Sequence, residues 1–113
     1  MSDMKKPLAR KDGLPSIEGP AGIFRTTLSY NPAVMLCHFR MNKGASVPLH
    51  SHPAAQNGYV IRGKLRFRRG ETESFTAEAG CSYVFDGNEP HGADVLEDAE
   101  VIECFAPMRP EYA

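Results

Sequence analysis

The sequence predicts an all-β protein, a sandwich or barrel built from short strands. Apolar and polar residues alternate over short runs, and in residues 64–68 leucine and phenylalanine alternate with three cations. Glycine and asparagine recur between these runs at the spacing of turns. No apolar period of 3.6 residues persists over ten residues, so we expect little helix. Many short strands with glycine-rich turns favour a closed or two-layered β architecture.

The expected strands begin at about residue 22. The first two, 24–30 and 33–42, are separated by Asn31 and Pro32, and the second alternates, with Cys37 and Phe39 on one face. Further short strands follow at 47–52, 57–62, 64–69, 71–77, 82–85, 91–96 and 100–105. The turn residues that divide them are Gly63, Gly70, Gly80, Gly87 and Asn88.

Residues 1–20 are interpreted as a flexible N-terminal arm with no secondary structure of its own. Prolines and cations dominate it: Lys5, Lys6, Pro7, Arg10, Lys11, Pro15 and Pro20. Residues 21–113 are expected to form a single domain. A chain of this size buries about two thirds of its unfolded surface, which is enough for one core.

Charge and hydropathy exclude two classes of partner. The net charge is −1, so no basic excess is present to bind nucleic acid. No apolar run approaches the roughly 20 residues of a membrane helix. Residues 1–14 lack the apolar core of a secretion signal. Three widely separated cysteines with no CxxC pair fit reduced thiols. We therefore expect a cytoplasmic protein with neither nucleic-acid nor membrane partners.

Three of the four histidines lie in one pattern. His50 and His52 are one residue apart on an extended segment, so their side chains point to the same face. Gln56 has the same parity, and His91 follows thirty-five residues later from a distant strand. Imidazole suits Fe, Ni, Cu and Zn. We predict one metal ion held by these four residues, whereas the fourth histidine, His38, is expected to be structural.

These residues also carry a resemblance to a known family. The pattern Gly44-x5-His50-x-His52-x3-Gln56-x6-Gly63 resembles the first motif of the cupins. The pattern Gly80-x5-Asp86-x-Asn88-x2-His91 resembles the second, with Asp86 and Asn88 where proline and glycine are commonest. The resemblance to small single-domain cupins covers roughly residues 22–110. It implies a double-stranded β-helix (the cupin or jelly-roll barrel), one bound divalent metal ion and, commonly, a homodimer.

Gln56 departs from most cupins, which carry glutamate at this position. An amide oxygen is able to bind a metal ion but brings no charge, so three imidazoles and an amide leave the full charge on the ion. Such an ion is a stronger Lewis acid and attracts anionic oxygens. We expect one divalent ion, Ni, Fe, Zn or Mn, because affinity order alone does not select among them.

The end of the chain offers a candidate acid or base. Val101, Glu103 and Phe105 alternate onto one face of the last expected strand. If that face lines the barrel, Glu103 is an enclosed carboxyl group suited to proton transfer. Tyr59 and Tyr83 are interpreted as packing or interface residues, with a role as an acid inside the barrel as the alternative for either.

A narrower resemblance includes this segment. The histidine motif and the terminal pattern acid-x-Phe-x-Pro-x-Arg, which starts at Glu103, look like the cupins of pectin and alginate degradation. Those enzymes convert 4,5-unsaturated uronates to linear 5-keto-4-deoxyuronate. The resemblance implies that Glu103, Phe105 and Arg109 are catalytic, with Arg109 as the clamp for a substrate carboxylate. The acid of that family is usually aspartate, and Glu103 is one methylene longer.

The sequence therefore predicts a metal-dependent cupin that acts on a small anionic sugar acid, an isomerase or tautomerase. Two alternatives stay open. The first is a small-ligand-binding or sensor cupin without catalysis. The second is another metal enzyme, such as a dioxygenase or a lyase. The nucleophile elbow GxSxG, the dinucleotide motif GxGxxG and the P-loop are absent from the sequence, so serine hydrolases and nucleotide-binding enzymes have no support.

Overall fold

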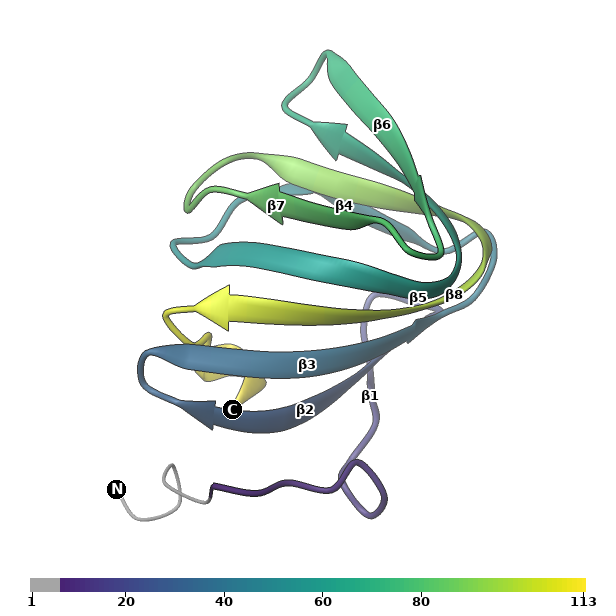
Figure 1. Ribbon diagram of the computed structural model, residues 1–113. Helices are drawn as coiled ribbons and strands as arrows, with labels where there is room; N and C mark the ends of the chain where they lie inside the picture. Colours follow the sequence, from purple (N-terminus) through teal and green to yellow (C-terminus); the bar gives the residue numbers. More distant parts are fainter. Residues whose placement is uncertain (1–6) are drawn as a thin grey trace.

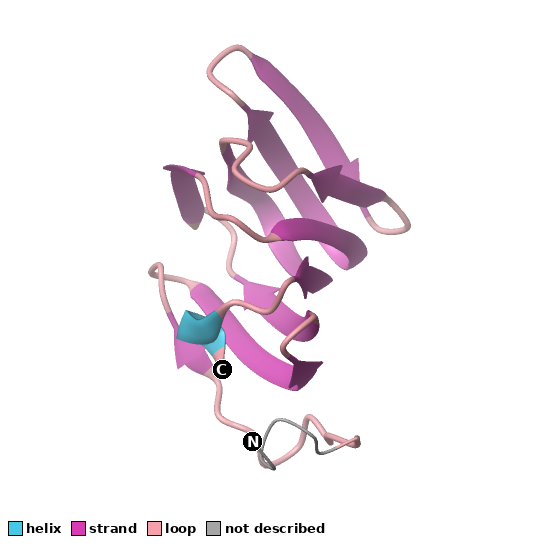
Figure 2. Cartoon of the chain, turned by 90° about the vertical axis from the view of Figure 1, so that its left-hand side faces the viewer, coloured by secondary structure: helices cyan, strands magenta, loops and turns pink. Residues whose placement is uncertain are grey.

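The computed structural model describes residues 7–113 and is built almost entirely from β-strands (Figures 1 and 2). The eight strands of these residues are β1 (Ile17–Glu18), β2 (Ile23–Asn31), β3 (Val34–Met41), β4 (Ser46–His50), β5 (Ala55–Arg69), β6 (Glu73–Glu78), β7 (Ser82–Phe85) and β8 (His91–Ala106). One turn of 3-10 helix, Pro110–Tyr112, follows β8. Within residues 7–113, no helix has the length and apolar character that a membrane crossing requires. The expected all-β class is confirmed.

Two long antiparallel strands, β5 and β8, form the centre of the fold. The first half of β5 pairs with the second half of β8, and these halves lie between β7 and the β3–β2–β1 strands. Their other halves pair with each other between β4 and β6. Both strands curve strongly at the right-hand side of Figure 1, so each belongs to both layers. This arrangement is the expected jelly-roll barrel.

The expected breaks at Gly63 and near residue 98 are wrong. Strands β5 and β8 run through these positions with shifts of register between residues 60 and 65. Gly63 has φ +90°, and a Cβ atom there would overlap the backbone oxygen of Asp98 and lie 2.5 Å from Cα of Ala99. Glycine is therefore needed for a bulge at which the two strands bend together.

The apolar core lies between the two layers. Leu65 and Phe67 of β5 are buried, as their alternation predicts, and so are Val101 and Phe105 of β8. Glu103 has the same parity as Val101 and Phe105 and is also buried. The inward face of β8 therefore brings a carboxyl group into the interior.

The N-terminal arm differs from its expected form. Residues 1–6, the start of the arm predicted over residues 1–20, lie outside the described residues. Ile17 and Glu18 form strand β1, which pairs with Phe24 and Arg25 of β2. The prediction that the arm has no secondary structure is therefore wrong at these two residues. A carboxylate oxygen of Glu18 accepts a hydrogen bond from the backbone N–H of Gly22, which stabilises the intervening turn. The domain boundary near residue 20 stays a prediction.

The bulge gives a test of the fold. We predict that Gly63→Ala lowers the free energy of unfolding by about 3 kcal/mol, because a positive φ and an overlap with backbone atoms add together. Gly44 is a matched control, since its φ is +89° and a Cβ atom there would meet nothing within 4 Å. Gly44→Ala should lose only about 1 kcal/mol, the effect of φ alone. Equal losses in urea denaturation would show that the close approach at Gly63 contributes nothing.

Candidate metal centre

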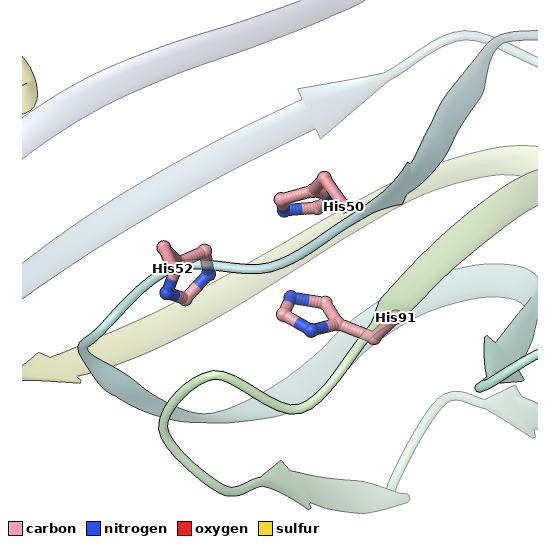
Figure 3. A group of neighbouring side chains, drawn as sticks. All are labelled: His50, His52 and His91. Carbon is pink, nitrogen blue, oxygen red and sulfur yellow. The ribbon is translucent and has the colours of Figure 1, made fainter.

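The pairing of β4 with β8 brings the histidine motif and the distant histidine together. His50, the last residue of β4, lies opposite His91, the first residue of β8. His52 follows in the loop two residues after β4, and Figure 3 shows its ring near those of His50 and His91. The ring centroids lie 4.5 Å apart for His50 and His91, 5.0 Å for His52 and His91, and 5.4 Å for His50 and His52. One nitrogen from each ring lies within 4.8 Å of the other two, which indicates a metal site.

The turn before His91 is fixed against the segment that carries His52. The backbone N–H of Asn88 donates a hydrogen bond of 2.7 Å to the carbonyl oxygen of His52. Asn88 has φ +63°, a conformation that asparagine tolerates better than most residues. A Cβ atom on Gly87 would overlap the carbonyl oxygen of Pro53, so this close approach requires glycine. The departures from the commonest second cupin motif therefore still form a tight turn.

Backbone carbonyls orient two of the imidazole rings. Nδ1 of His50 lies 2.9 Å from the carbonyl oxygen of Pro48, and Nδ1 of His91 lies 2.8 Å from that of Glu89. Because a carbonyl oxygen only accepts hydrogen bonds, each Nδ1 carries the proton. Each Nε2 then presents a lone pair, which is the form that binds a metal ion.

The amide of Gln56 completes the cluster. Its Oε1 atom lies 3.0 Å from Nε2 of His52 and 3.2 Å from Nε2 of His91. Its Nε2 atom donates a hydrogen bond of 2.9 Å to a carboxylate oxygen of Glu103, so Oε1 faces the imidazoles.

This arrangement tests whether the residues fit a metal ion. Nε2 of His91 is unprotonated and cannot donate to the Gln56 oxygen, so lone pairs face one another across this contact. Among the described residues 7–113, the buried Nδ1 atom of His52 also has no hydrogen-bond partner. A divalent cation satisfies converging lone pairs of this kind, and the neutral nitrogen and oxygen donor set suits a first-row transition metal. The residues therefore fit the expected cofactor.

Burial keeps the ligands in the metal-binding state. Burial is the largest cause that lowers the pKa of His52 and of His91 below the ordinary imidazole value. The positive charge of Arg109 lowers the pKa of His52 further. Both rings are therefore neutral near pH 7, as metal binding requires.

A cavity of about 70 Å³ adjoins the cluster, and His50, Gln56 and His91 line it together with Glu103 and Arg109. Glu103 is buried, and its pKa is raised above the ordinary carboxyl value by burial. Hydrogen bonds from Tyr83 and Gln56 and the charge of Arg109 partly offset this rise. A buried carboxyl group with a raised pKa beside a candidate metal site is suited to accept and return a proton.

The other two predicted catalytic residues also line this cavity. Phe105 is buried, and its ring centroid lies 5.9 Å from that of His52. The guanidinium carbon of Arg109 lies 5.2 Å from the centroid of Phe105 and 4.1 Å from that of Tyr112. Arg109 also donates hydrogen bonds of 3.1 and 2.9 Å to one carboxylate oxygen of Glu111. The two aromatic rings thus hold a cation at the wall of the cavity, where it is paired with Glu111.

Some features of the site have only a weak signal in the sequence. Tyr83 donates a hydrogen bond of 2.6 Å to Glu103, whereas the sequence predicts a packing or interface residue, with an acid inside the barrel as the alternative. The alternation of β7 places Tyr83 inward but does not identify Glu103 as its partner. His38 lies outside the cluster, and its Nε2 atom lies 2.7 Å from a carboxylate oxygen of Glu100, which agrees with a structural role.

Comparison with known proteins identifies the family. Residues 37–105, more than half of the chain, match the family described as the cupin domain. The chain belongs to the cupin family. No curated protein matches the sequence.

Solved cupin structures resemble this one closely. An RmlC-like cupin from Shewanella frigidimarina NCIMB 400 has a TM-score of 0.88 and 22% identity, with 96% of each chain covered. KdgF from Halomonas sp. has a TM-score of 0.85 and 28% identity, with 94% of this chain and 99% of that chain covered. The oxalate decarboxylase of Lactobacillus farciminis has a TM-score of 0.77 and 21% identity, with 92% of this chain and 34% of that chain covered. The first and third of these show the fold alone.

The cluster predicts a selective loss of metal binding. His91→Ala should weaken binding of Zn²⁺ or Ni²⁺ by at least about a hundredfold, because one of four donors is lost. Metal at 100 times its dissociation constant should stabilise the unmodified protein by about 2.7 kcal/mol and the variant hardly at all. Titration calorimetry and thermal unfolding measure the two effects.

The fourth histidine supplies the control for this experiment. His38→Gln also removes an imidazole, but from outside the cluster, and should retain the full metal affinity. Equal loss of affinity in both variants would place the ion elsewhere.

Proposed function

We propose that this cupin binds one divalent ion, Ni, Fe, Zn or Mn, through His50, His52, Gln56 and His91 and linearises a 4,5-unsaturated uronate to its 5-keto form. One observation carries the proposal. The buried carboxyl group of Glu103 is hydrogen-bonded to Gln56, whose other amide atom faces the imidazoles. Two lines support the substrate class: the terminal sequence pattern and the similarity to KdgF from Halomonas sp. over nearly the full length of both chains.

The reaction requires proton transfers and no net change in composition. The bond between C1 and the ring oxygen breaks, the C1 hydroxyl loses its proton, and C1 becomes an aldehyde. The ring oxygen remains on C5 as an enolate, and a proton then adds to C4 while C5 becomes a ketone. A bound metal ion supplies positive charge that polarises a substrate oxygen. Glu103 accepts the proton from the C1 hydroxyl and returns a proton to C4.

The remaining residues hold the substrate. Arg109 pairs with the uronate carboxylate at the cavity wall, where two nitrogens of its guanidinium are able to bind two oxygens. Phe105 closes the apolar side of the cavity beside His52 and excludes water from the sugar ring. A cavity lined by these groups suits a small anionic sugar acid. The homodimer expected from the cupin resemblance stays a prediction.

The proposal predicts that the metal-loaded protein consumes unsaturated galacturonate, followed as loss of absorbance of its C=C bond. Glu103→Gln should lower kcat by a factor of about 100 or more, because the amide cannot accept the proton. Its metal content should be unchanged. Glu97→Gln, which removes an exposed carboxylate from the same strand, serves as the control and should leave kcat unaltered.

The outcomes of this assay distinguish the three candidate functions. Metal-dependent binding of the sugar acid without turnover would indicate the sensor. Oxygen consumption by the Fe(II)-loaded protein would indicate a dioxygenase. Full activity in Glu103→Gln would remove this residue from the mechanism.

The contact between Arg109 and Glu111 predicts a variant that binds the substrate more tightly. Glu111 is mostly exposed and accepts hydrogen bonds from the same guanidinium that the substrate carboxylate needs. Glu111→Gln should therefore lower KM by about threefold with little change in kcat, the size expected for an exposed ion pair. Steady-state kinetics at two ionic strengths checks this, again with Glu97→Gln as the control. A higher KM would mean that Glu111 holds Arg109 in its binding position and does not compete for it.

A further inference from the structure

We propose that Tyr83 is a positioning residue that selects which oxygen of Glu103 faces the substrate, and that Gly58 provides the space through which it acts. The inference rests on the proposed function, because it concerns the carboxyl group assigned to proton transfer there. It adds Tyr83 to that site and assigns different roles to the two carboxylate oxygens of Glu103.

The strand register places three residues in one row across the sheet. Tyr83 of β7 and Glu103 of β8 both lie opposite Gly58 of β5, which runs between them. Two strand spacings, roughly 9–10 Å, separate the backbones of Tyr83 and Glu103. An ordinary side chain on the middle strand would fill the space between them.

Gly58 leaves this space open. A Cβ atom at Gly58 would lie 2.5 Å from Cζ of the Tyr83 ring and would overlap the phenol oxygen. The phenol of Tyr83 therefore crosses β5 directly over Gly58, and its hydroxyl donates a hydrogen bond of 2.6 Å to Oε2 of Glu103. Glycine is needed here for close packing, because its φ is not among the positive values.

The phenol is held rigidly and remains a donor. Tyr83 is only 6% exposed, and its ring centroid lies 4.2 Å from that of Phe67. Burial and the neighbouring carboxylate raise the pKa of Tyr83 well above its ordinary value, so the hydroxyl keeps its proton at neutral pH. Because packing already fixes this ring, little conformational entropy is lost when its hydroxyl holds Glu103 in place.

Two hydrogen bonds on one oxygen define the orientation of Glu103. Tyr83 and the Nε2 atom of Gln56 both donate to Oε2, at 2.6 and 2.9 Å. Among residues 7–113, no hydrogen bond is made to Oε1, and Glu103 lines the cavity. The free oxygen is thus the one that meets the substrate, while Oε2 anchors the group. Without the phenol, the carboxyl group has one anchor and is free to rotate. Misplacement by about 1 Å can lower a rate on the order of a hundredfold.

A double-mutant cycle tests the proposal with four metal-loaded proteins: unmodified, Tyr83→Phe, Glu103→Asp and the double variant. We expect Tyr83→Phe to lower kcat about tenfold with KM changed less than about twofold, since the ring and its packing remain. The shorter side chain of Glu103→Asp withdraws the carboxyl group beyond hydrogen-bond reach of the phenol. In that background, Tyr83→Phe should therefore change kcat less than about twofold.

Tyr59 supplies a matched control. It lies on β5, one residue after Gly58, and half of its surface is exposed. Tyr59→Phe removes a hydroxyl from the outer face and should leave kcat unaltered. An unchanged kcat in Tyr83→Phe, or an equal loss in both backgrounds, would overturn the positioning role.

A second measurement does not depend on turnover. In the zinc-loaded protein, a buried phenol bonded to a carboxylate should show a slowly exchanging hydroxyl proton by NMR. This signal should disappear in Tyr83→Phe, and the side-chain carboxyl carbon resonance of Glu103 should shift with it. If no sugar acid is turned over, the proposed function fails while this readout still decides the contact. An unmoved Glu103 resonance would overturn the inference even in an active protein.

Discussion

The antiparallel pairing of β5 with β8 is the constraint on which the rest of the structure depends. Each strand belongs to both layers, so this one pairing, with its shifts of register between residues 60 and 65, fixes the core and the site together. Gly58 lies opposite Glu103 in one half of the pair, and Arg69 lies opposite His91 in the other. Gln56 and Glu103 thereby face the same interior space as the histidines that β4 brings to the start of β8. Gly63 lets the pair bend without separating.

The polar groups of the interior form one connected chain. Tyr83 and Gln56 donate to Glu103, and the oxygen of Gln56 faces His52 and His91. A buried network of this kind is stable only when each member has a partner. The two donors near Glu103 both meet an acceptor oxygen, whereas Nε2 of His91 faces the oxygen of Gln56 without a proton between them. The positive charge of a bound metal ion would stabilise the lone pairs at the histidine end of this network. Because Gln56 is uncharged, that charge stays available to an anionic substrate.

Local sequence patterns predict much of the fold and of the candidate site, but they fail at features that depend on tertiary contacts. The inward positions of Gln56 on β5 and Glu103 on β8 follow from the period of a strand, which is a local property. His52 does not follow from it, because β4 ends at His50 and the strand predicted over residues 47–52 does not extend to His52. The sequence predicts a turn at Gly63 and not a bulge, because glycine is favoured in both and only the approach of Asp98 in the folded chain distinguishes them. Similarly, the contact of Tyr83 with Glu103 depends on the register of three strands. The carbonyl oxygens that orient His50 and His91 belong to the backbone, so no residue type in the sequence identifies them.

The central claim is that three imidazoles and one amide oxygen hold a single cation. Anomalous diffraction at the absorption edge of the bound metal, from crystals of the protein, tests this claim most directly. The account predicts one strong peak per chain, coordinated by Nε2 of His50 and His91, a ring nitrogen of His52 and Oε1 of Gln56. A metal-loaded crystal without a peak at this point, or with Gln56 turned away from the ion, would contradict it.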